Sequence, residues 1–212
     1  MSYAYRGSKS SSVASRHART RTGQRKNQQR KSRGQYIDPS RFVAIAKMTE
    51  AEAYTPLHNF ADFALNNKLH ANLATKGYTV PSPIQDKTIP AGLAGRDIIG
   101  IASTGTGKTA AFVLPILNRL MADAQSAALV VAPTRELAQQ IEAECKFLAK
   151  GSGLFGALLI GGTGMGSQLR DLKHNPRIVI GTPGRIKDHL ERGTLNLSKF
   201  NMIALDEVDR ML

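Results

Sequence analysis

The sequence predicts an α/β fold in which helices cover both faces of a doubly wound parallel sheet, and three observations lead to this prediction. Short apolar runs alternate with amphipathic stretches from about residue 97 onward. The runs are continuously apolar, which is typical of strands that are buried on both faces. Small or polar residues come directly after each run, at the edge of the sheet where the ligands of such folds bind.

The first expected element is a helix with leucines at every fourth position, Leu65, Leu69 and Leu73, which ends before Gly77. A proline-rich turn and a second helix follow in "VPSPIQDKTIPAGLAG", ending near 92–95. Strands are then expected at 97–103, 127–132, 155–160, 177–181 and 201–207. Helices are expected after the first four of them, at 108–121, 135–150, 166–174 and 184–192. This βα alternation favours right-handed crossovers within one parallel sheet.

Charge and composition divide the 212 residues into three parts. Residues 1–41 hold eleven of the 29 Lys and Arg residues and one acid, so most of the net charge of +13 lies there. We expect residues 1–35 to be a disordered basic tail, because they contain too few aliphatic side chains to form a core. A linker with a short helix near 40–47 is expected over 36–59, and one folded domain over 60–212. For the tail, a phosphate-binding arm, a solvated segment without a specific role and a transit peptide remain alternatives.

The chain has one cysteine, Cys145, so it can form neither an internal disulfide nor a cysteine metal site. We expect it to be a buried, inert thiol. The five histidines do not have the spacing of a metal site, and the apolar runs are too short to span a bilayer. These features predict a cytoplasmic protein that does not associate with a membrane.

The segment "ASTGTGKT", residues 102–109, follows the expected strand 97–103 and opens a helix. This is the pattern of a P-loop, in which backbone N–H groups surround phosphates at a helix N-terminus. The loop residues Ser103, Thr104, Gly105, Thr106 and Gly107 would bind the phosphates. Lys108 would reach the β and γ phosphates, and the Thr109 hydroxyl would hold Mg²⁺.

Three acids, Asp206, Glu207 and Asp209, follow the last apolar run. In P-loop enzymes a second strand delivers an acid to the metal, and Asp206 fits this role. Glu207 is then placed to orient or deprotonate the attacking water. The two residues and Lys108 are the expected catalytic set.

With these motifs in order, residues 60–212 resemble a DEAD-box ATP-dependent RNA helicase. The segments "GYTVPSPIQ" (77–85), "ASTGTGKT", "PTRELA" (133–138), "GG" (161–162), "TPGR" (182–185) and "DEVD" (206–209) resemble successive motifs of that family. The resemblance implies a P-loop NTPase domain of the RecA-like type, with ATP and Mg²⁺ as cofactors. Val208 stands where the family has alanine, and we expect this replacement to be tolerated because both residues are apolar.

The resemblance also assigns roles to single residues. It implies that Gln85 recognises the adenine edge and that Phe60 packs near the adenine. It further implies that RNA is held through its sugar-phosphate backbone, independently of sequence. The residues that match the RNA-contacting motifs are Thr134, Arg135, Gly162, Thr182, Gly184 and Arg185.

Nothing in the sequence resembles the second RecA-like domain of the family, whose arginines stabilise the transferring phosphoryl group. We therefore expect an N-terminal piece of a helicase, truncated just after "DEVD", that binds ATP and RNA but is inactive alone. Two alternatives remain. One is a different P-loop enzyme, such as a small-molecule kinase or a translocase. The other is a non-catalytic RNA-binding or regulatory fragment.

Overall fold

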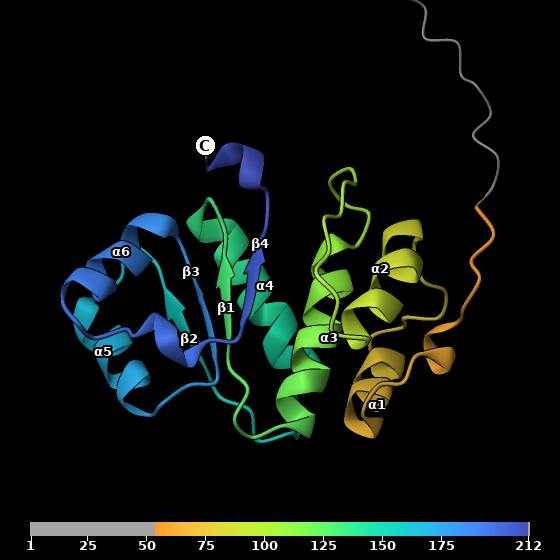
Figure 1. The fold of residues 1–212 in the computed structure, drawn as a ribbon, viewed down its shortest axis with the longest axis horizontal. Coiled ribbons are helices and arrows are strands. Elements are labelled where there is room, and N and C mark those ends of the chain that lie inside the picture. Colours follow the sequence, from red (N-terminus) through yellow and green to blue (C-terminus); the bar gives the residue numbers. More distant parts are fainter. Residues whose placement is uncertain (1–53, 212) are drawn as a thin grey trace, which may run out of the picture. The chain divides into compact units, whose positions relative to one another are not determined.

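The computed structural model describes residues 54–211 (Figure 1). The basic tail and the helix expected near 40–47 lie outside the described residues. The elements, in chain order, are η2 (Phe60–Asp62), α1 (Asn67–Thr75), α2 (Pro83–Leu93), α3 (Lys108–Ala122), β1 (Ala128–Val131), α4 (Arg135–Leu148), β2 (Gly156–Leu159), α5 (Met165–Lys173), β3 (Ile178–Gly181), α6 (Pro183–Glu191), η3 (Leu197–Lys199), β4 (Met202–Leu205) and η4 (Val208–Arg210). None of the helices in this part of the chain is long and apolar enough to cross a membrane.

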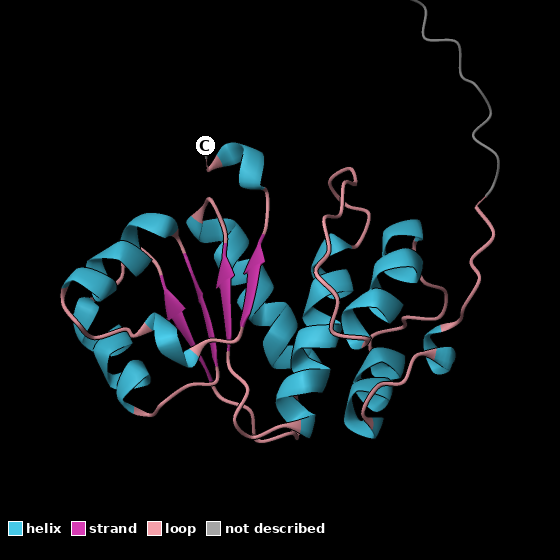
Figure 2. Cartoon of the chain, in the orientation of Figure 1, coloured by secondary structure: helices cyan, strands magenta, loops and turns pink. Residues whose placement is uncertain are grey.

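The four strands form one parallel sheet in the order β2-β3-β1-β4. Every strand is preceded in the chain by a helix, and the strands are seen side by side between helices in Figure 2. The carboxyl ends of the strands therefore meet at one edge of the sheet, as the doubly wound fold class predicts.

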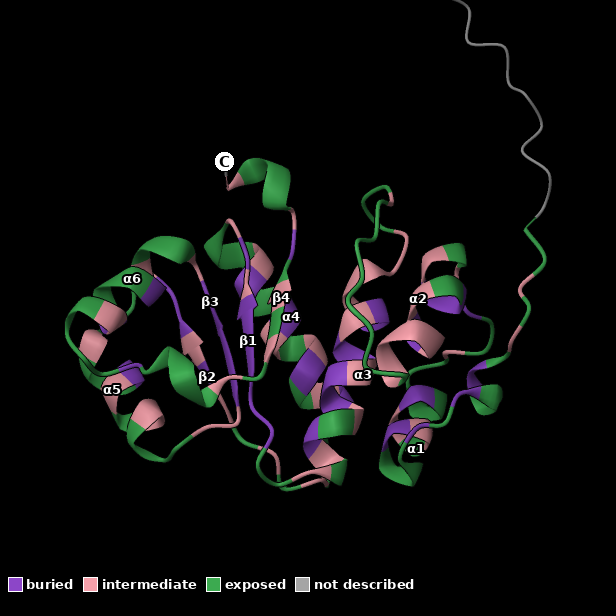
Figure 3. Ribbon diagram, in the orientation of Figure 1, coloured by how far each residue is buried: buried purple, intermediate pink, exposed green. Residues whose placement is uncertain are grey.

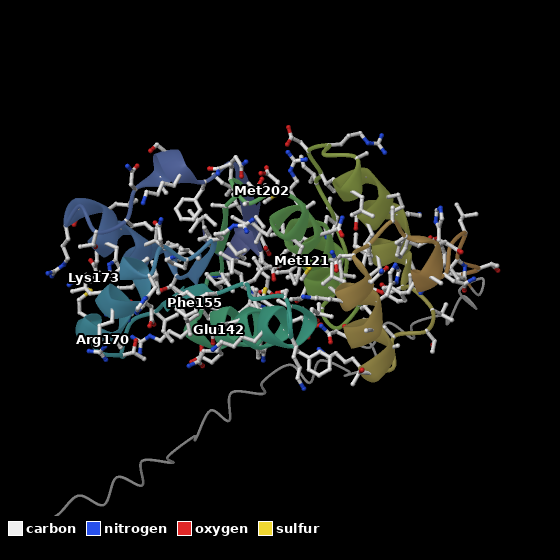
Figure 4. All side chains as sticks on the ribbon, turned by 90° about the horizontal axis from the view of Figure 1, so that it is seen from below. Met121, Glu142, Phe155, Arg170, Lys173 and Met202 are labelled. Atoms are coloured by element: carbon white, nitrogen blue, oxygen red, sulfur yellow. The ribbon has the colours of Figure 1, made fainter. Side chains whose placement is uncertain are left out.

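Successive side chains of the central strands point to opposite faces, and each face has its own core. Ala128 and Val130 of β1 pack with the cluster formed by α1, α2, α3 and α4, while Leu129 packs with Ile186 of α6 and Leu159. Because apolar side chains are needed on both faces of the sheet, the sequences of these strands are continuously apolar. Side chains fill the space between these layers (Figure 4).

Helices α2 and α3 pack closely because Gly92 has no side chain. A Cβ atom at this position would lie 2.8 Å from Cγ of Pro115 on α3. This close contact anchors the helix that carries Gln85 to the helix that begins at Lys108. Cys145 is buried on α4, and this burial raises the pKa of its thiol to about 12, as expected of an inert cysteine.

The strand expected at 97–103 does not form, and this corrects one prediction from the sequence. Residues 96–103 have no regular structure, and the side chains of Ile99 and Ile101 are each 94% exposed. A strand needs a hydrogen-bonded neighbour, and none of the strands in residues 54–211 pairs with this segment. Figure 3 shows the segment and part of β4 as exposed; Ile203 on β4 is 63% exposed.

Other boundaries differ by a few residues from the prediction. The expected first helix, α1, begins at Asn67 and so leaves out Leu65, because Asn66 caps its start by accepting the N–H of Lys68. The last strand ends at Leu205, so that Asp206 and Glu207 lie in the turn after it.

Candidate functional site

The phosphate loop leads directly into α3, as the sequence predicts. Gly107 is the N-cap of α3 and has φ of +87°, and Gly105 has φ of +80°, a region that favours glycine. The Thr106 hydroxyl donates to the Ser103 carbonyl at 2.7 Å and closes the turn. Ser103, Thr104 and Gly105 are exposed, so their backbone N–H groups are accessible to a ligand.

The Lys108 amine lies on the loop itself. It donates to the Ala102 carbonyl at 2.9 Å, and the side chain is half-buried together with Thr109. A phosphate group that entered the loop would offer this amine a charged acceptor in place of a neutral carbonyl, which is a stronger hydrogen bond.

Gln85 on α2 contacts the phosphate loop at Gly107, the last residue before α3. Its amide Nε2 donates to the Gly107 carbonyl at 3.1 Å, and its Oε1 accepts the N–H of Ser82 at 2.9 Å. A Cβ atom at Gly107 would lie 2.4 Å from this Nε2, so a side chain at position 107 is excluded. Gln85 is buried, and each group of its amide already has one protein partner. One N–H and one lone pair remain for a second partner.

Phe60 is part of the hydrophobic core. It is 4% exposed and makes edge-to-face contacts with Phe63 and Tyr78, at centroid distances of 5.7 and 5.3 Å. These contacts account for a large aromatic residue here without a ligand. A contact of Phe60 with adenine stays a prediction.

The charge of Lys108 acts on Asp206 although the two residues are nearly one hundred residues apart in sequence. Asp206 is 8% exposed, and burial raises the pKa of its carboxyl group above the ordinary value, while the positive charge of Lys108 acts to lower it. The charge of Glu207 raises the pKa of Asp206 further, while a hydrogen bond from the Glu207 backbone acts to lower it. The fold therefore brings the acids after β4 toward the amine of the phosphate loop, at the carboxyl edge of the sheet.

Glu207 has an unusual backbone conformation. With φ of 50° and ψ of 52° it occupies the left-handed region, which is uncommon for a residue other than glycine. Its side chain is 15% exposed and forms an ion pair with Arg210, with Nη1 and Oε2 3.0 Å apart. Backbone strain of this kind is often found where a side chain must be held in a fixed direction.

The residues expected to bind Mg²⁺ have suitable chemistry. Within residues 54–211 no group of three or more His, Cys, Asp or Glu side chains forms a metal cluster. Mg²⁺ in nucleotide sites does not need one, since one or two protein oxygens and the phosphates complete its shell. Thr109 offers a hydroxyl and Asp206 a buried carboxylate whose charged form a cation would stabilise.

The residues expected to contact RNA gather at a second place on the same edge. A hollow of about 530 Å³ is lined by nine residues from three segments of the chain. They are Pro133, Thr134, Arg135, Glu136, Gly161, Thr182, Gly184, Arg185 and Asp188. Five of the six expected residues thus line one surface. The sixth, Gly162, adjoins it, since a Cβ atom there would lie 2.3 Å from Nη1 of Arg135.

Two of these residues also cap helices. Thr134 is the N-cap of α4 and accepts the N–H of Leu137 at 3.2 Å. Thr182 is the N-cap of α6, with Pro183 in the first turn. Both helices therefore direct their N-termini, which carry partial positive charge, toward the hollow.

Sequence reasoning missed three polar features next to these sites. Asp86 on α2 is buried and accepts four hydrogen bonds from the segment 54–58. Asp188 contributes a carboxylate to the hollow beside Arg185, with Nε and Oδ2 3.4 Å apart. Gln168 and His189 form a buried pair behind the hollow. None of them has a clear signal in the sequence.

Comparisons with known proteins agree with this geometry. The sequence model of the family described as DEAD/DEAH box helicase matches residues 82–212. The chain is 46% identical over 154 residues to the ATP-dependent RNA helicase CshA of Listeria monocytogenes, covering 72% of this chain and 30% of that protein. It is 50% identical over 155 residues to the ATP-dependent RNA helicase DeaD of Klebsiella pneumoniae, covering 72% of this chain and 24% of that protein. The chain thus spans about a quarter to a third of the length of these relatives.

Solved structures show the same likeness. A DEAD box protein from the hyperthermophile Methanococcus jannaschii aligns with a TM-score of 0.68 at 40% identity, over 72% of this chain and 42% of that one. A hypothetical ATP-dependent RNA helicase from Sulfolobus tokodaii aligns with a TM-score of 0.65 at 35% identity, over 69% of this chain and 43% of that one.

Proposed function

Because the chain belongs to the DEAD/DEAH box helicase family, we propose that it supplies the first, ATP-binding domain of an ATP-dependent RNA helicase. One observation carries this proposal. Gln85 contacts the phosphate loop at Gly107, and Lys108, the next residue, acts electrostatically on Asp206. A glutamine amide and a lysine amine thus contact one loop, and the charge of that amine acts on a nearby carboxylate; these are the kinds of group that adenine, phosphates and a divalent cation require.

Nucleotide binding follows from these positions. The backbone N–H groups of the loop would hold the phosphates, and Lys108 would exchange the Ala102 carbonyl for a phosphate oxygen. The free N–H and lone pair of Gln85 match the donor and acceptor of the adenine edge, which guanine does not offer in the same order. We therefore expect ATP to be preferred over GTP.

Hydrolysis would depend on the two acids after β4. Thr109 and Asp206 would hold Mg²⁺, which when bound offsets the negative charge of the phosphates. Glu207 would orient the attacking water and accept its proton. The left-handed backbone of Glu207 and its ion pair with Arg210 would fix the direction of its side chain for this role. Efficient turnover would further need a cation from a second RecA-like domain, as the arginine of comparable enzymes accelerates phosphoryl transfer by about a thousandfold or more.

The hollow next to this site would bind the RNA backbone. Arg135 and Arg185 supply positive charge, and the N-termini of α4 and α6 supply N–H groups, at positions that can reach phosphates. None of these donors is specific for a base, so sequence-independent binding is expected.

The experiment that tests this function compares nucleotides on the 212-residue chain. We expect a fluorescent ATP analogue to bind and to be displaced by ATP but poorly by GTP, and Gln85→Ala to reduce that difference. Thr88→Ala, on the same helix, is the control. Equal displacement by ATP and GTP in the unsubstituted chain would favour a different P-loop enzyme. Binding of RNA without any binding of nucleotide would favour a regulatory RNA-binding role.

A further inference from the structure

We propose that Gln168 and His189 are positioning residues that fix the turn 161–163 for contact with an RNA phosphate. The inference rests on the proposed function and adds to it two residues that lie outside the expected site. Both are polar, and both are buried, with exposed fractions of 2% and 0%. Buried polar side chains are costly unless each is hydrogen-bonded, so their partners show what they hold in place.

The partners of Gln168 belong to the turn. Its amide Nε2 donates to the Ile160 carbonyl at 2.9 Å and to the Thr163 hydroxyl at 2.7 Å. The Thr163 hydroxyl itself donates to the same Ile160 carbonyl at 3.1 Å. Gln168 thus connects Ile160 and Thr163, which lie on either side of the glycines at 161 and 162 in the link between β2 and α5.

These contacts fix which nitrogen of His189 carries a proton. The Ile160 carbonyl can only accept, so the amide nitrogen of Gln168 must face it and the amide oxygen must face His189. That oxygen lies 3.1 Å from Nε2 of His189, which must therefore donate. The other ring nitrogen, Nδ1, lies 2.8 Å from the Thr194 hydroxyl.

His189 is expected to be neutral in this network. Burial lowers the pKa of its ring, and Arg185 and Arg192 lower it further, against an opposing effect of Asp188. A neutral ring with its proton on Nε2 can donate to Gln168 and accept from Thr194. The network is then satisfied at both nitrogens when the Thr194 hydroxyl donates to Nδ1. The same hydroxyl lies 3.0 Å from the His189 carbonyl, to which it can donate instead.

The same turn is held from outside by the two arginines of the hollow. Arg185 donates to the Thr163 carbonyl at 3.4 Å, and Arg135 lies against the two glycines. Arg185 and His189 are four residues apart on α6. The same helix therefore supplies a contact on the exposed side of the turn 161–163 and another on its buried side. If the hydrogen bonds of Gln168 and His189 were lost, Arg135 and Arg185 would still contact the turn. The backbone N–H groups of the turn, however, would no longer be held in fixed positions.

The test measures RNA and nucleotide affinity separately on the 212-residue chain. The probes are a fluorescent oligouridylate, at about 0.2 M salt to weaken non-specific charge contacts, and a fluorescent ATP analogue. We expect Gln168→Leu, which keeps the volume and removes the hydrogen bonds, to weaken RNA binding about tenfold. ATP affinity should stay within about twofold. Gln140→Leu, at an exposed glutamine of α4, is the matched control and should change neither.

Two results would overturn the proposal. One is unchanged RNA affinity in a folded Gln168→Leu variant. The other is an equal loss of RNA and ATP affinity, which would indicate a general structural role. Arg135→Ala and Arg185→Ala separate this proposal from the RNA-binding function: if they too leave RNA affinity unchanged, the hollow is not the RNA site.

A second measurement needs no variant. Nitrogen-15 spectra of the histidine rings in the unsubstituted chain distinguish the neutral forms from each other and from the charged form. We expect His189 to be neutral at pH 7, with its proton on Nε2. A proton on Nδ1 alone, which would leave Nε2 unable to donate to Gln168, would contradict the hydrogen-bond network that carries the inference.

Discussion

Replacing Asp86 by asparagine tests how the segment 54–58 is attached to the domain. The carboxylate is buried, and its Oδ2 accepts the Tyr54 hydroxyl at 2.5 Å and the N–H of Leu57 at 2.8 Å. Its Oδ1 accepts the N–H of His58 at 3.2 Å and the ring Nδ1 at 2.6 Å. All four donors come from this short segment. Asparagine keeps the shape but replaces one oxygen by an NH₂ group, which must face two of these donors.

The size of the effect follows from the pKa of this carboxyl group. Burial alone would raise the pKa of Asp86, but the hydrogen bonds from Tyr54, Leu57 and His58 lower it from 3.8 to about 2. At about 1.4 kcal/mol per pKa unit, the folded state favours the charged carboxylate by about 2–3 kcal/mol. The free energy of unfolding of a domain is only about 5–15 kcal/mol, so Asp86→Asn should be clearly destabilising.

The assay is thermal unfolding of the 212-residue chain at pH 7, followed by circular dichroism. For a chain of this size each kcal/mol shifts the Tm by about 2–4 °C, so we expect a decrease of about 4–12 °C. Asp123→Asn is the control. Asp123 also accepts a backbone N–H and a hydroxyl, from Gln125 and Ser126, but its side chain is 34% exposed and it holds only its own turn.

The dependence on pH gives the second half of the test. Because the folded pKa of Asp86 is below its unfolded value, its contribution is present above about pH 4 and is lost as the pH falls toward 2. The Tm difference between the unsubstituted chain and Asp86→Asn should therefore shrink over this range. A difference below 1 °C at pH 7, or one that does not change with pH, would refute the reasoning.

Four further predictions concern binding and turnover. Lys108→Ala should weaken nucleotide binding about tenfold or more, because the phosphates lose a charged donor, and titration with a fluorescent ATP analogue measures this. Glu207→Gln should keep nucleotide affinity in that titration and abolish phosphate release by the helicase that contains this domain; an equal loss of binding would make Glu207 structural. Asp188→Asn should raise RNA affinity about twofold to fivefold, since the carboxylate that competes with phosphate for an arginine is removed, and an exposed pair of this kind has a small effect. Deleting residues 1–35 should lower RNA affinity and flatten its dependence on salt without changing ATP affinity; an unchanged salt slope would leave the tail without a role in RNA binding.

Much of the candidate site could be predicted from the sequence because its residues follow strands. The carboxyl ends of parallel strands share one edge of the sheet, so Arg135 after β1, Gly162 after β2 and Arg185 after β3 had to lie near one another. Arg135 and Arg185 line one hollow and Gly162 adjoins it, so the three residues do lie near one another. Their contact with RNA stays a prediction.

The features that the sequence did not predict depend on contacts between distant segments. Asp86 looks like an ordinary acid in a first helical turn, and only the fold brings Tyr54 and His58 onto its carboxylate. Gln168 and His189 are buried because α5 and α6 pack side by side over the turn after β2, which helical periodicity alone does not specify. The left-handed backbone of Glu207 likewise has no counterpart in composition or spacing.

The wrong prediction at residues 97–103 shows why an apolar run alone does not make a strand. Its isoleucines have the β-branched side chains and the continuous apolar pattern of a buried strand, but Ile99 and Ile101 are 94% exposed in the structure. On β4, Ile203 and Leu205 are also more than half exposed. Fully burying a side chain of this kind contributes about 1.5–3 kcal/mol, so the exposed parts of these four side chains represent about 5–9 kcal/mol of stabilisation that is absent here. Such a quantity is comparable to the whole stability of a domain.

The backbone of an exposed edge is hydrated, so its unpaired N–H and C=O groups cost little; the missing stabilisation lies in the apolar side chains. A strand is thus specified by its neighbours as much as by its own residues, and the phosphate loop can keep its turn and its helix N-terminus while the segment before it remains irregular.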